Sequence, residues 1–200
     1  MAFQRYLIDG YGQLEINNCA FRRDGRIEAQ CFLDPADFAD ESMEKASVPC
    51  ENGMVLAVDK ARHMVRFPVA NETLPLAINF SAEHMYDERA NGLKDHKIEW
   101  RKDGEYFLPR MGYLAVGDLF TTNCFGYDSE KFADDEELEE AAKNMFADED
   151  PTGRLYAAPS EEGAWVISNA RAASGCAAEV VKAFTMPDGT FALQLRILAL

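Results

Sequence analysis

Basic residues are scarce in this 200-residue sequence. It has 20 Lys and Arg against 35 Asp and Glu, which gives a formal net charge of −15. A nucleic-acid backbone repels so acidic a chain, and no stretch rich in Lys and Arg interrupts the acidic background. The sequence therefore predicts that the protein does not bind nucleic acid.

Long apolar runs and closely spaced cysteines are missing as well. No apolar run approaches the roughly 20 residues that a helix needs to cross a bilayer, and residues 1–10 lack the apolar stretch of a signal peptide. We therefore expect a soluble protein that has no membrane contact and is used without export. The five cysteines are an odd number and contain no C-x-x-C pair. This argues against a disulfide scaffold or a zinc site, and it predicts buried thiols in a reducing compartment.

The motifs of common enzyme classes are also absent. The chain has three histidines, but it has no H-E-x-x-H motif, no G-x-S-x-G elbow and no glycine-rich phosphate loop. The sequence therefore assigns no catalytic, cofactor-binding or metal-binding residue. Residues 83–96 keep an enzymatic alternative open, because their histidines and carboxylates could serve a small hydrolase or lyase if the fold brought them together. These side chains are His84, Asp87, Glu88 and His96.

What the sequence does contain is a series of short apolar runs separated by turn residues. Two such runs flank Asp24-Gly25, a pair that can supply the positive φ angles of a tight turn. We therefore expect residues 14–21 and 27–33 to form a hairpin. Strands are also predicted at 54–58, 64–67 and 74–80.

A second turn signal follows later in the chain. Gly117-Asp118 separates candidate strands at 107–116 and 119–125, and it also suits a two-residue turn. The clearest strand lies at 190–198, where apolar residues alternate with polar or small ones. The turn Met186-Pro-Asp-Gly precedes it and predicts a hairpin with residues 179–185.

One acidic amphipathic helix is predicted at about 134–146. Asp134 can cap its first turn, and Leu138, Ala142 and Phe146 recur at helical spacing to form one apolar face. Residues 128–150 contain 11 acidic and 2 basic residues, which we interpret as a solvated face. With no βαβ rhythm, the sequence predicts a mainly β fold of short antiparallel strands and hairpins, forming a barrel or a sandwich-like body.

We divide the chain into an N-terminal hairpin or arm with its connector, 1–48, and a β-rich body, 49–200. The body includes the acidic helix and the C-terminal hairpin. Large aromatic residues are enriched at protein interfaces, and an extended arm can add strands to the sheet of a neighbouring chain. The residues predicted to form such an interface are Tyr6, Tyr11, Phe21, Arg22 and Arg23.

Three segments of the body together form one pattern. They are Glu51-Asn-Gly-Met-Val-Leu-Ala-Val-Asp, Met64-Val-Arg-Phe-Pro-Val and Leu74-Pro-Leu-Ala-Ile-Asn-Phe. They read as a glycine-led strand, a turn, a valine-rich strand and a returning strand. This pattern resembles the small β modules of tailed-bacteriophage virion proteins, and it is most similar to head decoration, or capsid cement, proteins. With the stretch from Arg110 to Asn123, the resemblance covers residues 51–125. The N-terminal hairpin and the acidic helix depart from the smallest members of that family.

The resemblance implies a non-enzymatic structural protein without cofactors. Such a protein would bind the outer face of an assembled shell as a homo-oligomer, with the major capsid protein or another virion protein as its partner. It would be made in the host cytoplasm and reside in the virion. A tail or neck component is a second structural alternative, and the small hydrolase or lyase remains an alternative of another class.

Overall fold

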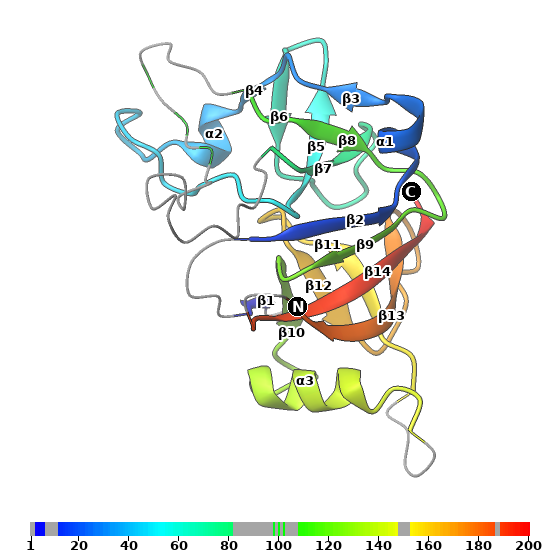
Figure 1. Ribbon diagram of the computed structural model, residues 1–200. Coiled ribbons are helices and arrows are strands. Elements are labelled where there is room, and N and C mark those ends of the chain that lie inside the picture. Colours follow the sequence, from blue (N-terminus) through cyan, green and yellow to red (C-terminus); the bar gives the residue numbers. More distant parts are fainter. Residues whose placement is uncertain are drawn as a thin grey trace, which may run out of the picture.

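The computed structural model describes residues 3–6, 12–81, 98, 100, 102, 108–147, 153–186 and 189–200. Within these residues the chain forms two mixed, mostly antiparallel sheets and three short helices. Figure 1 shows the smaller sheet above the larger one, with helix α3 (Asp135–Lys143) below both. The prediction of a mainly β fold is confirmed. The sequence left a barrel and a sandwich-like body as alternatives. The described strands form two separate sheets and no closed barrel.

The larger sheet has eight strands among the described residues. In spatial order they are β1 (Phe3–Arg5), β10 (Phe125–Asp128), β12 (Trp165–Ser168), β11 (Tyr156–Pro159), β13 (Ala177–Thr185), β14 (Phe191–Ala199), β9 (Leu119–Thr122) and β2 (Leu14–Asn18). Neighbours are antiparallel except β10 and β12. The predicted C-terminal hairpin is confirmed, because β13 pairs with β14. The alternating apolar side chains of β14 are buried, and they contribute to the main hydrophobic core.

The smaller sheet has six strands within the described part of the chain. In spatial order they are β3 (Ile27–Glu28), β8 (Met111–Tyr113), β7 (Leu76–Asn79), β5 (Val55–Asp59), β6 (Met64–Arg66) and β4 (Phe32–Leu33). The three strands predicted between residues 54 and 80 are confirmed as β5, β6 and β7. Helix α2 (Pro35–Phe38), which the sequence did not predict, follows β4 and buries Phe38 in a second hydrophobic cluster.

The N-terminal segment supplies the strand at each end of both sheets. β1 and β2 are the outermost strands of the eight-stranded sheet, and β3 and β4 are those of the six-stranded sheet. Each pairs with a strand from the rest of the chain: β10, β9, β8 and β6 respectively. The described part of the predicted N-terminal arm is therefore built into the body.

The predicted hairpin around Asp24-Gly25 is wrong. Residues from Ala20 to Asp24 form a short helix, α1, and Gly25 ends it in the left-handed conformation at a φ of 68°. The strands on either side lie in different sheets. A glycine with positive φ serves a helix end as well as a tight turn. Here the helix places the Phe21 side chain in the core, where it is 0% exposed.

The predicted hairpin around Gly117-Asp118 is also wrong, because β8 and β9 belong to different sheets. The Asp118 side chain, which is 3% exposed, fixes this crossing. It accepts hydrogen bonds from the backbone N–H groups of Ala20 (2.7 Å) and Ala115 (2.8 Å). One buried carboxylate thus joins the start of α1 to the connection between the sheets.

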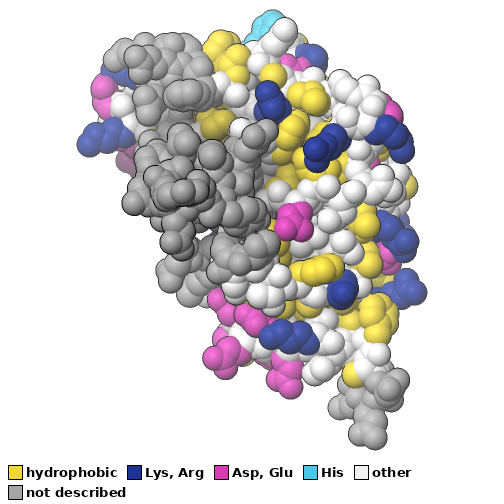
Figure 2. All heavy atoms as spheres, in the orientation of Figure 1, with side chains coloured by type: hydrophobic (Ala, Val, Ile, Leu, Met, Phe, Trp, Pro, Cys, Tyr) yellow, Lys and Arg dark blue, Asp and Glu magenta, His cyan; other side chains and the backbone are white. Residues whose placement is uncertain are grey.

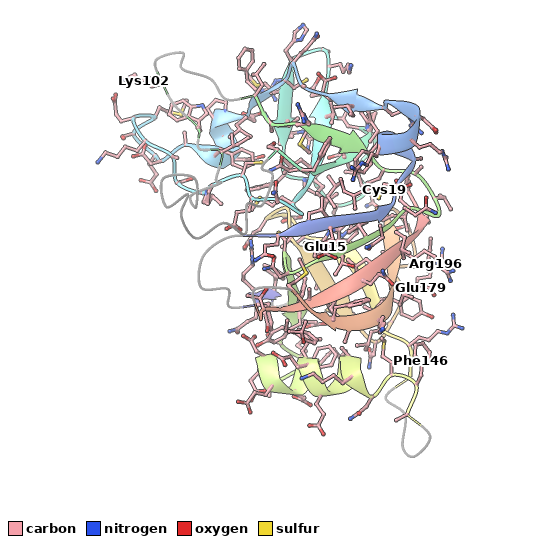
Figure 3. The ribbon with its side chains drawn as sticks, viewed as in Figure 1. Glu15, Cys19, Lys102, Phe146, Glu179 and Arg196 are labelled. Atoms are coloured by element: carbon pink, nitrogen blue, oxygen red, sulfur yellow. The ribbon has the colours of Figure 1, made fainter. Side chains whose placement is uncertain are left out.

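The predicted acidic helix is confirmed as α3 (Asp135–Lys143). The Asp134 side chain caps it by accepting a hydrogen bond from the N–H of Glu137. Its apolar face is buried and packs against β13, while Figure 2 shows acidic side chains gathered over its outer side. Phe146 departs from the prediction: it follows the last turn of the helix and is 65% exposed. Figure 3 labels it beyond the end of the helix. No helix among the described residues has the length and apolar character needed to cross a bilayer.

We predict that Asp118→Ala lowers the free energy of unfolding by about 3 kcal/mol, because two partly buried N–H groups lose a charged acceptor. Urea unfolding followed by circular dichroism measures the change. Asp24→Ala is the control, since Asp24 pairs with Arg23 at the surface. Equal stability of the two variants would contradict this role of Asp118.

Candidate functional site

The residues predicted to form an interface do not gather on one surface. Tyr6 and Phe21 are buried in the main core, and Tyr11 lies outside the described residues. Arg22 and Arg23 are exposed on α1. Of the four that the structure describes, the two arginines face solvent. Their spacing in the sequence could not show this difference, because it depends on which side of α1 meets the core.

The predicted enzymatic segment, residues 83–96, lies outside the described residues. The remaining histidine, His63, is exposed in the turn before β6. The described residues contain no cluster of three His, Cys, Asp or Glu side chains that could hold a metal ion.

A buried polar cluster links the N-terminal strands to the loop that precedes β5. The Arg5 guanidinium forms a salt bridge with Glu51, and Asn79 donates from its side chain to the Glu51 carbonyl oxygen (2.9 Å). The N–H of Gln13 donates to the side-chain oxygen of Asn123 (2.6 Å). These contacts connect residues that are far apart in the sequence, and they hold the two sheets together at one point.

Gly53 allows the loop before β5 to lie close to Thr122 at the end of β9. Its φ is 86°, and a Cβ at this position would lie 2.2 Å from the hydroxyl oxygen of Thr122. That hydroxyl donates to the carbonyl oxygen of Gln13 (2.7 Å). A larger residue at position 53 would therefore be strained and would also displace the Thr122 side chain.

All five cysteines are free and buried, as the sequence predicted. Burial raises the pKa of the Cys31 and Cys124 thiols to about 11. It also raises the pKa of the Cys19 and Cys176 thiols to about 12, and it raises the pKa of Cys50. For Cys124 this effect of burial outweighs the nearby Arg5, which lowers the pKa. Protonated, enclosed thiols are poor nucleophiles, so these side chains serve as core residues.

An open groove of about 1110 Å³ is lined by residues of both sheets. One wall comes from residues 68–76, which lead into β7, and the facing wall comes from residues 158–162 and 172–176. Much of the lining is apolar. Val69 is its most exposed large hydrophobic side chain, at 54%. Arg26 and the pair Glu161-Glu162 also line the groove, so it carries charge of both signs.

Hydrogen bonds of uncharged polar side chains shape one wall of this groove and join it to the other. Ser160 accepts hydrogen bonds from the backbone N–H groups of Glu162 (3.2 Å) and Ala164 (3.1 Å), which shapes its own turn. The Ser174 hydroxyl donates to the Asn71 side chain (3.3 Å) and joins the two walls. Ser160, Ser174 and Asn71 therefore contribute to the shape of the groove.

Glu72 fixes the wall formed by residues 68–76. Its carboxylate pairs with Arg66 (2.8 Å) and accepts from the N–H of Leu74 (2.9 Å) and of Val69 (3.2 Å). Burial alone would raise the pKa of Glu72, but these hydrogen bonds and Arg66 outweigh it and lower the pKa. The charged form of Glu72 therefore stabilises the groove.

No protein-family model matches this chain, and comparisons with curated proteins and with solved structures found no match. The fold and the groove are therefore interpreted from this chain's own residues.

We predict that the folded protein resists thiol modification. At about pH 8 a chromogenic disulfide reagent should react with its five cysteines at least about 100-fold more slowly than in denaturant, because the thiols are buried and protonated. The unfolded protein is the control and should titrate five thiols. Rapid labelling of one thiol in the folded protein would show an accessible thiolate.

We predict a pH-dependent contribution from Glu72. Because its pKa is lowered in the folded state, its stabilisation is present above the ordinary carboxyl range and is lost as the pH falls through the folded pKa. Glu72→Gln should cost about 1 to 2 kcal/mol at neutral pH, and the cost should shrink as the pH falls below the ordinary carboxyl range. Urea unfolding across this range tests it, with the exposed Glu161→Gln as the control. A cost that stays constant with pH would refute this contribution.

Proposed function

We propose that this protein is a non-enzymatic structural component of a tailed-bacteriophage virion that decorates and stabilises the capsid. The open groove between the sheets carries the proposal. It offers apolar surface for binding, and the side chains of Ser160 and Ser174 make hydrogen bonds within the fold. The sequence resemblance of residues 51–125 to head decoration proteins supplies the class of partner.

The occupant that we propose for the groove is an extended segment of the major capsid protein. Such a segment would place apolar side chains against Val69 and its neighbours, an acidic residue near Arg26 and a basic residue near Glu161 and Glu162. Complementary charges of this kind favour one partner and one register over others. Several protomers bound to one lattice would turn individually weak contacts into a durable attachment.

The proposal is tested by co-sedimentation with empty shells of the phage that carries the gene, prepared without this protein. We expect saturable binding at a fixed ratio to the shell subunits. Binding to isolated tails and not to shells would move the protein to the tail or neck. Binding to neither would overturn a virion role.

We predict that Val69→Asp weakens shell binding by at least about tenfold, because it places a charge on the apolar lining of the groove. Sedimentation at a series of protein concentrations gives the dissociation constant. Val48→Asp is the matched control, since Val48 is also exposed, at 36%, but does not line the groove. Both variants should remain folded. Equal binding by the two would place the contact outside the groove.

A further inference from the structure

The segment Phe3–Tyr6 lies at one end of the eight-stranded sheet and contacts it as a bound peptide would. β1 pairs antiparallel with β10, with Phe3 opposite Asp128 and Arg5 opposite Gly126. The N–H of Tyr6 extends the pairing by donating to the carbonyl oxygen of Phe125 (3.0 Å). Main-chain pairing of this kind supplies affinity in strand-addition complexes.

Side-chain contacts make this site specific for the sequence of the segment. The Phe3 ring lies over Gly126, where an added Cβ would be 2.2 Å from a ring carbon. The Arg5 guanidinium pairs with Glu51. The Tyr6 ring lies 4.8 Å from that of Phe125.

The hydroxyl of Tyr6 reaches a third part of the chain, because it donates to the Glu139 carboxylate on α3 (2.8 Å). The Tyr6 ring also lies 6.0 Å from the ring of Phe191 on β14. The four-residue segment Phe3–Tyr6 thus contacts a glycine, two carboxylates and two aromatic rings.

Every partner of the segment in these contacts comes from elsewhere in the chain. We call these residues the acceptor site: Glu51, Phe125–Asp128, Glu139 and Phe191. The acceptor site is complete without residues 3–6, so it would make the same bonds to that segment from any copy. Exchange of an identical element between protomers creates an interface from contacts that the monomer already has.

We propose that the acceptor site binds residues 3–6 of a second copy, so that copies of this chain associate by exchanging their N-terminal strands. The exchange retains the β1–β10 pairing, the Arg5–Glu51 salt bridge and the burial of Tyr6. This inference concerns contact between copies and does not rest on binding to a shell.

The Arg5–Glu51 pair allows a test with full-length chains. Arg5→Glu alone and Glu51→Arg alone each place like charges in the pair, whether the strand binds its own chain or another identical copy. After the two variants are mixed, exchanged strands restore opposite charges at both acceptor sites. We expect the mixture to melt roughly 5 °C higher than either variant and to contain complexes with both chains.

Glu179 and Arg196 provide the matched control. They form a salt bridge within the β13–β14 hairpin, and Figure 3 shows them side by side on neighbouring strands. Mixing Glu179→Arg with Arg196→Glu should restore nothing, because strands in the middle of a sheet do not exchange. The proposal is overturned if the mixture of Arg5→Glu and Glu51→Arg chains shows only the melting transitions of the two separate variants.

A second measurement uses the unaltered protein. Native mass spectrometry of an equal mixture of unlabelled and isotope-labelled chains, incubated together, should detect oligomers that contain both. The mixed oligomers should be lost in Gly126→Val, because the valine side chain would occupy the space of the Phe3 ring. Wild-type chains that remain monomeric at all concentrations used for shell binding would refute exchange, while leaving the groove and its partner unaffected.

Discussion

The described fold depends on one constraint: the edge strands of both sheets come from the first 33 residues. An edge strand without a neighbour leaves a row of backbone N–H and C=O groups unpaired, and such a row recruits other chains. Here β1, β2, β3 and β4 cover β10, β9, β8 and β6. They are themselves short, which limits the open edge that they leave. The polar contacts of Arg5 and Gln13 then fix this N-terminal segment between the sheets.

Features that depend on a local pattern were predictable from the sequence. The C-terminal hairpin and α3 follow from residue spacing, and the buried thiols follow from the lack of cysteine pairs. The helix end at Gly25 and the crossing at Gly117 were not predictable, because a glycine with positive φ fits a helix end or a loop as well as a tight turn. Long-range contacts decided between these structures: the burial of Phe21, and the hydrogen bond from the distant N–H of Ala20 to the carboxylate of Asp118.

The groove could not be predicted in the same way, since its walls come from segments about 90 residues apart in the sequence. Glu72 carried no motif, yet it fixes one wall through Arg66 and neighbouring N–H groups. Aromatic content alone suggested that Tyr6 and Phe21 could form an interface, but composition does not reveal which aromatic side chains the core requires. The sequence shows that Arg22 and Arg23 are charged, but it does not show that α1 exposes them.

The order of strands in the eight-stranded sheet has a consequence for synthesis. β2 pairs with β9, and β9 pairs with β14, which contains residues 191–199. The N-terminal strands leave the ribosome first, but the sheet that they border is complete only when the last strand has emerged. Because pairing between distant segments is slow to form, we expect this sheet to be completed late in folding. Until β14 has emerged, its neighbours β13 and β9 lack a pairing partner, and unpaired strand edges are prone to aggregation.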